Sequence, residues 1–220
     1  MFSECSLEWS FLNQTLLLFP QKAIFWKEES TLIVSDLHIG KVGHFRKAGI
    51  AIPKTLEQED LSTLSDLIFE CRPSKIIFLG DLFHSDMNND WNWLELWRSL
   101  FPQIQMILVK GNHDILHPEY YLAAGFEITD RYETPLFLFV HEPLSLDQLE
   151  FQKKYVLSGH LHPGVKLRGV ARQNLTISCF YFGLKQAILP AFGRFTGNYC
   201  LKIENSSTIF GIVNKKVVEL

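Results

Sequence analysis

The residues best suited to chemistry are acids, an amide and histidines that recur in short blocks along the chain. In the first block, Asp36 and His38 are separated by one residue and follow the apolar run TLIV at 31–34. The full set of candidate metal ligands is Asp36, His38, Asp81, Asn112, His141, His160 and His162. Seven oxygen and nitrogen donors without a thiolate are too many for one tetrahedral zinc ion. They suit two adjacent divalent ions, with Mn²⁺, Fe or Zn²⁺ as the candidates.

Each block taken alone is a weak signal. A lone D-x-H is more often a turn acid beside an incidental histidine, and Gly80-Asp81 indicates little more than a turn. The blocks GNHD (111–114) and GHLH (159–162) are more specific, because such polar runs make poor core elements. In GHLH, the two imidazoles at i and i+2 are expected to point the same way from an extended backbone, as chelation needs. We reject coincidence for the whole set, because matches in the same structural context reinforce one another.

Short apolar runs precede all five blocks and are predicted to be strands that are covered on both faces. The runs are TLIV (31–34), KIIFL (75–79), QMILV (105–109), FLFV (137–140) and YVLS (155–158). Amphipathic helices are expected at 54–71 and 91–100, each followed by a proline. The alternation predicts βαβ units in an α/β fold, in which ligands bind outside the carboxyl ends of the strands. The donors should therefore meet at one edge.

The two ends of the chain are predicted to contain strands and turns. Residues 15–19 and 23–26 flank a Pro-Gln-Lys turn and indicate a hairpin. From residue 175 onward, the pattern holds only short strands and turns, which suggests a second sheet packed on the first. In the helix at 91–100, Trp91, Trp93 and Trp97 are interpreted as core and cap residues.

Length and composition limit the classes of protein to consider. Residues 1–220 are expected to form one domain, because no linker, repeat or low-complexity tract divides them. No apolar run approaches the roughly 18 residues of a membrane span, and the amino terminus lacks a signal-peptide pattern. The four cysteines are scattered, so we expect reduced thiols in a cytoplasmic protein. With a net charge of −3, any polyanion must be bound by a local patch.

The blocks D-x-H, G-D, G-N-H-D, H and G-H-x-H, in order across residues 36–162, resemble those of the calcineurin-like metallophosphoesterases. The resemblance implies a four-layer α/β/β/α sandwich, in which two packed mixed sheets are flanked by helices. It implies one ion on Asp36, His38, Asp81 and His162. It implies a second ion on Asp81, Asn112, His141 and His160, with Asp81 as the bridge. As the catalytic pair, His113 would face the substrate phosphate and Asp114 would orient it.

Longer stretches are similar to one branch of that family, the ligase-associated metallophosphoesterases, which are described as DNA damage response endonucleases. The stretches are SDLHIGKVGHFRKAGIAIP, GDLFHS, HEP, SGHLHPGVKL and LPAFGRFTGN, and the resemblance covers nearly the whole chain. It implies DNA as the substrate, expected to be single-stranded. It also implies a role in DNA repair alongside an ATP-dependent DNA ligase, a helicase and a nuclease. Ser178 departs from the branch, where a proline is expected.

The chemistry so implied is phosphodiester hydrolysis by a Mn²⁺-dependent endonuclease. Two cations about 3.5–4 Å apart can lower the pKa of a shared water to about 7, which yields a bridging hydroxide as nucleophile. His113 would assist the leaving oxygen. Lys41, His44 and Arg46 are predicted to hold substrate phosphates, Arg46 through its bidentate fork. Lys166, Arg168, Arg172 and Arg194 are weaker candidates for a basic track, and His84 is left open between a site residue and a structural histidine.

Two other functions were weighed. A phosphoesterase or pyrophosphatase acting on a small or lipid-linked nucleotide is the main alternative, because the SDLH opening is similar to that of the UDP-diacylglucosamine pyrophosphatases. Residues 115–135 are, however, too short and too acidic for the basic helical lid of those enzymes. A non-catalytic scaffold, as among retromer-subunit relatives, is disfavoured because Asn112, His113 and the four ligand imidazoles are intact.

Overall fold

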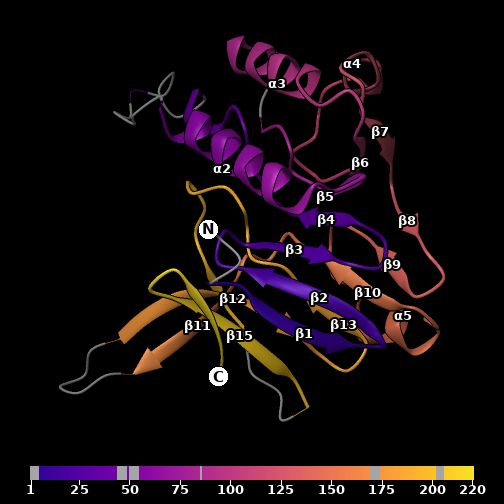
Figure 1. Cartoon of the computed structure of the whole chain (residues 1–220), viewed down its shortest axis with the longest axis vertical. Helices are drawn as coiled ribbons and strands as arrows, with labels where there is room; N and C mark the ends of the chain where they lie inside the picture. Colours follow the sequence, from indigo (N-terminus) through magenta and orange to yellow (C-terminus); the bar gives the residue numbers. More distant parts are fainter. Residues whose placement is uncertain (1–4, 44–48, 50–54, 85, 169–173, 202–205) are drawn as a thin grey trace.

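The computed structural model describes residues 5–43, 49, 55–84, 86–168, 174–201 and 206–220, except for the side chains of residues 55–57 and 168. Two β-sheets pack face to face, and helices cover the outer face of the first sheet (Figure 1). The predicted α/β fold with two packed mixed sheets is confirmed. Within the described ranges, no helix is long and apolar enough to cross a membrane.

The first sheet has seven strands that follow the order of the chain. They are β1 (Leu7–Phe11), β2 (Gln14–Phe19), β3 (Ala23–Trp26), β4 (Thr31–Val34), β5 (Lys75–Leu79), β6 (Gln105–Val109) and β7 (Glu127–Thr129). Strands β1 to β4 pair antiparallel, and β4 to β7 pair parallel. The predicted hairpin is confirmed as β2–β3, whereas β1 adds an outer strand that its mixed polar pattern had not revealed.

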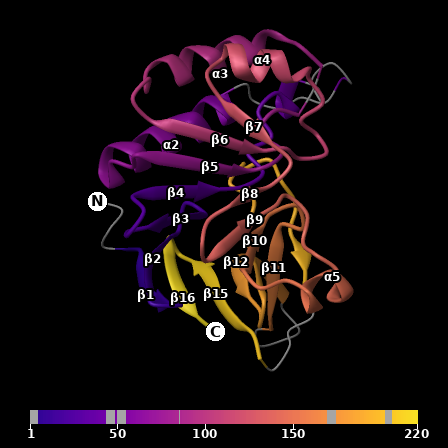
Figure 2. The same cartoon turned by 90° about the vertical axis from the view of Figure 1, so that its right-hand side faces the viewer.

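Three helices cover one face of this sheet, α2 (Thr55–Cys71), α3 (Asn89–Ser99) and α4 (Pro118–Ala123) (Figure 2). Helix α3 begins earlier than predicted because the side chain of Asn88 caps it by accepting a hydrogen bond from the Asp90 amide. Trp91 and Trp97 are buried, but Trp93 is half exposed, so only two of the three tryptophans belong to the core.

The second sheet is mixed and has the order β14-β11-β12-β13-β10-β9-β8, with β15 paired to β12 and β16 paired to β15. Its strands are β8 (Tyr132–Glu133), β9 (Phe137–Phe139), β10 (Tyr155–Ser158), β11 (Pro163–Arg168), β12 (Asn174–Phe182), β13 (Gln186–Ile188), β14 (Tyr199–Cys200), β15 (Thr208–Val213) and β16 (Lys216–Glu219). On its outer face the short helix α5 (Leu146–Glu150) packs Leu149 against Leu138 and Val156. Among the described residues, the outer helical layers are therefore unequal.

One of two large hydrophobic clusters lies between the two sheets, and the other lies between the first sheet and its helices. Ile33, Ile77 and Val109 from the first sheet share one buried cluster with aromatic and aliphatic side chains of the second. Burial of each such side chain contributes roughly 1.5–3 kcal/mol. This packing holds the two sheets in a fixed relation.

The five predicted strands before the polar blocks are all present, but they are divided between the two sheets. Strands β4, β5 and β6 belong to the first sheet, and β9 and β10 to the second. The expectation of a single sheet edge is therefore wrong. The polar blocks still converge, because the loops after β4 and β10 meet where the His160 amide donates to the Asp36 carboxylate (3.0 Å).

Candidate metal centre

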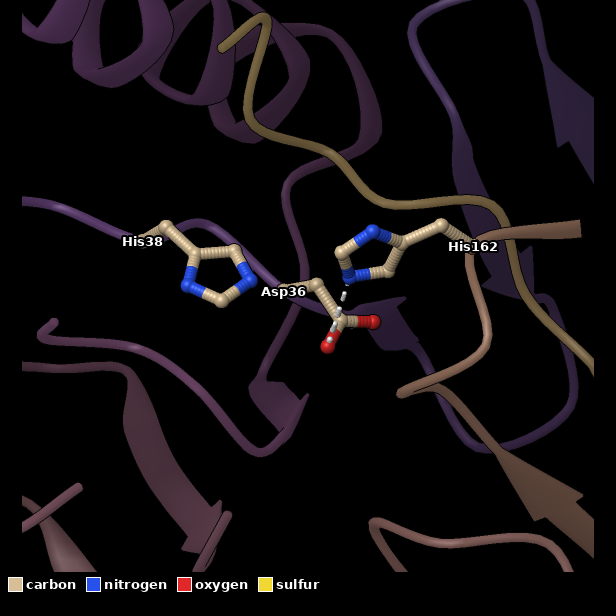
Figure 3. Close-up of side chains that lie close together, drawn as sticks. All are labelled: Asp36, His38 and His162. Atoms are coloured by element: carbon tan, nitrogen blue, oxygen red, sulfur yellow. Dashed lines mark ion pairs between the residues drawn. The ribbon is translucent and has the colours of Figure 1, made fainter. Parts of the chain in front are cut away.

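The strand ends bring six of the predicted ligands into two groups. The first donor group is Asp36, His38 and His162 (Figure 3), and the second is Asp81, His141 and His160. Within each group, the potential ligand atoms lie within 4.8 Å of one another. Asp36 and Asp81 are 0% and 2% exposed, so two carboxylates are held almost out of water. Buried carboxylates of this kind are stable only when cations or hydrogen bonds compensate them.

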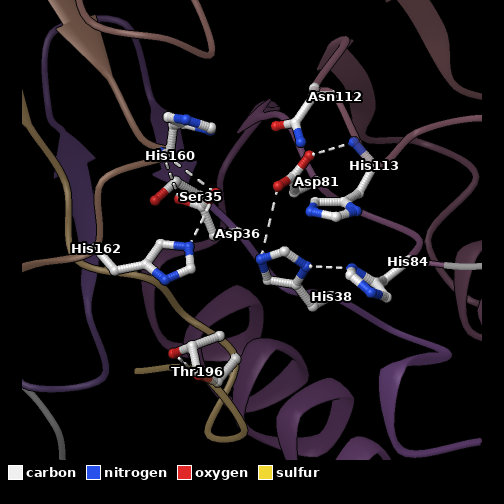
Figure 4. Close-up of polar contacts among 12 residues, drawn as sticks. Ser35, Asp36, His38, Asp81, His84, Asn112, His113, His160, His162 and Thr196 are labelled. Carbon is white, nitrogen blue, oxygen red and sulfur yellow. Dashed lines mark hydrogen bonds and ion pairs between the residues drawn. The ribbon is translucent and has the colours of Figure 1, made fainter. Parts of the chain in front are cut away.

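Asp81 lies between the two groups (Figure 4). Its Oδ2 is 3.6 Å from Nε2 of His38, and its Oδ1 is 3.5 Å from Nε2 of His141. The main-chain amide of His113 donates to Oδ1 at 2.9 Å and fixes the carboxylate. Burial raises the pKa of Asp81, whereas His141 and the His113 hydrogen bond lower it. One oxygen toward each group is the arrangement of a bridging carboxylate.

The second donor group contains acceptors that face each other. Nδ1 of His141 lies 2.8 Å from the carbonyl oxygen of Leu79, which only accepts, so Nδ1 carries the proton and Nε2 is left with a lone pair. That Nε2 is 2.9 Å from Oδ1 of Asn112 and 3.1 Å from Nδ1 of His160. In the neutral ring, no proton lies between the Nε2 and Oδ1 lone pairs. A divalent cation would convert this repulsion into coordination, so the residues fit a metal.

The first donor group contains buried nitrogens that face carboxylates, His38 toward Asp81 (3.6 Å) and His162 toward Asp36 (3.4 Å). Within the described residues, Nε2 of His38 and Nε2 of His162 are buried and make no hydrogen bond. Buried polar atoms are normally paired, so these two orphans also fit a metal ligand role. Burial, together with the charges of Lys41 and the neighbouring histidines, lowers the pKa of His38 to about 2. His38 therefore stays neutral, as a metal-ligating imidazole must be.

The ligand loops have an unusual backbone. Five ligand residues other than glycine have positive φ angles, namely Asp36 (53°), His38 (52°), Asp81 (50°), His160 (66°) and His162 (48°). This left-handed conformation costs on the order of 1–3 kcal/mol at each such residue and tends to occur at functional sites. The expected extended backbone of the GHLH block is therefore wrong. Its two imidazoles diverge, with His160 in the second group and His162 in the first.

Two glycines leave room for the ligands. Gly80 has φ +77° and precedes Asp81, and a Cβ there would collide with the ring of His141. A Cβ on Gly111 would collide with the main chain and carboxylate of Asp81. The glycines of the G-D and G-N-H-D blocks are thus required for close packing as well as for turning.

His113 and Asp114 are placed differently from each other. The ring of His113 is 5.5 Å from that of His38, between ring centres, so it borders the first donor group. Asp114 is fully buried and accepts hydrogen bonds from the amides of Phe83 (3.0 Å) and Gly111 (2.9 Å). Burial raises the pKa of Asp114 to about 7. Both its oxygens hold the main chain of the ligand loops, and the predicted task of orienting the His113 ring stays a prediction.

His84 is the neighbour of His113 that sequence reasoning left open. Its ring centre is 4.0 Å from that of His113, and its Nδ1 is 3.1 Å from Nδ1 of His38. It therefore contacts both a ligand and the candidate acid (Figure 4). The only sequence signal was its place three residues after Asp81, which cannot show the path of the loop.

The predicted phosphate-binding cations are only partly described. Lys41 is half-buried; burial lowers its pKa, whereas the carboxylates of Asp81 and Asp36 raise it, which places its charge near the donor groups. Three further candidates lie outside the described residues, namely His44, Arg46 and Arg172. Lys166 is exposed on β11, and the side chain of Arg168 is not described. Arg194 binds acids of α2, so it is not a solvated track residue.

The comparisons with known proteins agree with this geometry. The family model described as calcineurin-like phosphoesterase matches residues 30–160, which is more than half of the chain. A search of curated proteins gives no match.

Among solved structures, the nuclease MPE of Pseudomonas putida is 26% identical, with a TM-score of 0.78, and the alignment covers 98% of this chain and 100% of that chain. The phosphoesterase Yfce of E. coli is 12% identical, with a TM-score of 0.43 and coverage of 86% and 97%. With its ligand blocks brought together as that family requires, the protein belongs to the calcineurin-like phosphoesterases, a family of metal-dependent hydrolases.

Proposed function

We propose that the protein is an endonuclease that hydrolyses DNA phosphodiester bonds with two divalent ions, Mn²⁺ being the preferred metal. The observation that carries the proposal is the position of Asp81, whose two oxygens face the two donor groups. Donors made of nitrogen and oxygen, without sulfur, favour Mn²⁺, Fe or Zn²⁺. The Asn112 amide oxygen next to His141 adds a seventh donor, which suits two ions rather than one.

The residues of the chain have separate tasks in this reaction. When bound, two ions would supply an activated water and neutralise charge on the non-bridging phosphate oxygens. The two donor groups would hold the ions, with Asp81 facing both. His113 borders the first donor group and is available to donate a proton to the leaving oxygen. Lys41 adds a cation beside the buried carboxylates, where a phosphate of the substrate would lie.

DNA is favoured as the substrate by the likeness to the nuclease MPE, which runs over 98% of the chain. The alternative, a lipid-linked nucleotide, would call for a long basic helical lid. Residues 115–135 contain only the six-residue helix α4 and the short strands β7 and β8. These residues therefore do not form such a lid.

The test is a hydrolysis assay of metal-free protein that is reloaded with Mn²⁺, Fe²⁺, Zn²⁺ or Mg²⁺. Circular single-stranded DNA, duplex DNA and a UDP-linked lipid are compared, with Asp81→Asn as the inactive control. We expect Mn²⁺-dependent linearisation of the circular single strand. Hydrolysis of the lipid alone would overturn the DNA assignment, and no hydrolysis of any substrate would overturn the enzyme assignment.

A further inference from the structure

A segment from the second sheet crosses to the first sheet beside the metal centre. Residues 190–198, here called the strap, connect β13 to β14 and contact both the Asp36 loop and α2 (Figure 1). Phe192 of the strap is 4% exposed and belongs to the core between the first sheet and its helices. The strap is therefore built into both halves of the fold.

The main chain of the strap holds the first donor group from both sides. The amides of Phe192 and Gly193 donate to the carbonyl oxygens of Ser35 (2.8 Å) and Asp36 (3.1 Å). A Cβ on Gly193 would collide with the Leu37 carbonyl, so the strap passes very close to the Asp36 loop. Just beyond the strap, the amide of Tyr199 donates to the carbonyl oxygen of His162 at 2.9 Å.

The second donor group has no comparable contact. Among the hydrogen bonds described for the strap, none reaches the residues of that group. The position of the strap should therefore affect the two groups unequally.

Arg194 fixes the strap to α2. Its main-chain amide donates to Oδ2 of Asp60 at 3.1 Å, and its Nε lies 3.3 Å from Oδ1 of the same side chain. The guanidinium also donates to Oγ1 of Thr63 at 3.1 Å and pairs with Glu59. Asp60 is only 5% exposed. A rigid guanidinium fork that binds three residues of one helix gives the strap a defined position.

At its other end, the strap is tied to the second sheet. Oγ of Ser178 on β12 donates to Oδ1 of Asn198 at 3.0 Å. Ser178 is the position where this chain departs from its branch, so this tether depends on the residue that the chain itself carries. Inside the strap, the hydroxyl of Thr196 donates to the Gly193 carbonyl at 2.8 Å. Thr196 faces the side of the site where His38 and His162 lie (Figure 4).

We infer that Arg194 is a positioning residue for the first donor group. By fixing the strap to α2, it holds the carbonyls of Asp36 and His162 at the spacing that a divalent ion needs in that group. The inference rests on the proposed function, because it concerns the same metal centre. It assigns to Arg194 a structural task that acts on one ion and not on the other.

The experiment is a calorimetric titration of Co²⁺ into metal-free protein, which needs no substrate. His162→Ala and His160→Ala provide reference curves for loss of the first and second group. We expect Arg194→Ala to lower the affinity of the first donor group for its ion about tenfold, at the lower end of the effect of residues that support metal ligands. The affinity of the second donor group should not change. Asp60→Asn should act on the same ion, because it removes the acid of the ion pair with Arg194, but more weakly than Arg194→Ala, which also loses the contacts with Thr63 and Glu59.

The matched control is Lys215→Ala. Lys215 lines the same cavity of about 460 Å³ as Arg194 and Asp60, but it is not among the residues that bind the strap. The Lys215→Ala variant should bind both ions as tightly as the wild type does. Equal weakening of both ions in Arg194→Ala, or no weakening, would overturn the inference. A wild type that binds two ions but cleaves no diester would instead overturn only the proposed function.

Discussion

The two donor groups are built in different ways. In the second group, the Leu79 carbonyl fixes the ring of His141 from one side, and the other ring nitrogen of His141 directly faces Asn112 and His160, so the ligands lie in contact with one another. In the first group, among the described residues, Nε2 of His38 and of His162 makes no hydrogen bond, and support comes from His84 and Tyr199, which lie outside the group. The second group is thus fixed by its own strand ends, whereas the first depends on contacts from elsewhere in the fold.

The two groups should therefore respond differently to substitutions of the residues around them. Loss of an outer-shell partner should change the first group more than the second. Substitutions at the residue that both groups share should remove the distinction.

Asp81→Ala should abolish activity, with a loss greater than the roughly 10–100-fold cost of an outer-shell partner. It removes the carboxylate that faces both groups and leaves the imidazoles without an acid between them. Metal content per chain and hydrolysis of bis(nitrophenyl) phosphate are the measurements. Near-normal turnover with two bound ions would refute the bridging role and the comparison with it.

His113→Ala should lose roughly 10²–10⁴ in rate on a poorly activated diester while it keeps both ions. A substrate with a nitrophenolate leaving group should be affected less, because that group departs without a proton. The ratio of the two losses is the readout. Equal losses would show that His113 serves the metal shell or the phosphate charge, and would place it within the first donor group.

Much of this arrangement could be predicted from the sequence, because the signals are local. Short apolar runs marked β4, β5, β6, β9 and β10, and polar residues directly after them marked the ligands. Their division into two sheets was not predictable in the same way. Strands buried on both faces read alike, whichever sheet they join.

The backbone and partners of the site could not be predicted either. The left-handed φ of His160 and His162 depends on tertiary contacts that over-determine it, not on the propensity of Gly-His-Leu-His. The partners of Asp114 are main-chain amides, one of which belongs to a residue 31 positions away. The role of Arg194 likewise depends on Asp60, at a separation of 134 positions. Such contacts leave no periodic trace in a sequence.

His84→Ala should weaken the first ion by about 10–100-fold and spare the second, because an outer partner of a ligating imidazole fixes its ring. Nδ1 of His84 lies 3.1 Å from that of His38, whose other nitrogen faces Asp81. His117→Ala is the matched control, because His117 has a side chain that is 66% exposed and caps α4. A Co²⁺ titration of both variants decides. If His84→Ala weakens both ions alike, the two groups are not independent.

Lys41→Ala should raise KM for DNA several-fold and change KM for a minimal diester little, because only DNA has neighbouring phosphates to lose. The slope of the logarithm of the DNA binding constant against the logarithm of the salt concentration should also become shallower, by about 0.7 for a single strand. Lys216→Ala, on the outer strand β16, removes the same charge from an exposed position and is the control. An unchanged slope would return Lys41 to the role of balancing the Asp36 and Asp81 carboxylates.

The smallest expected effect is a change in stability at Asp60, the α2 partner of the strap. Burial raises the pKa of Asp60 to about 6, although Arg194 and Lys22 lower it. A carboxyl whose pKa is raised by folding stabilises the native state below its unfolded pKa, and this contribution is lost as pH rises through about 6.

Asp60→Asn keeps the shape of the side chain but cannot ionise. The free energy of unfolding of the variant should therefore rise relative to that of the wild type between pH 4 and pH 7. Urea unfolding of the metal-free proteins at several pH values measures this difference. The variant would then be no less stable at neutral pH and yet bind the first ion more weakly, which separates positioning from general stability. A difference that stays constant with pH would mean that the ion pair with Arg194 balances the cost of burying the Asp60 charge, and a variant that loses stability relative to the wild type as pH rises would mean that the ion pair outweighs it.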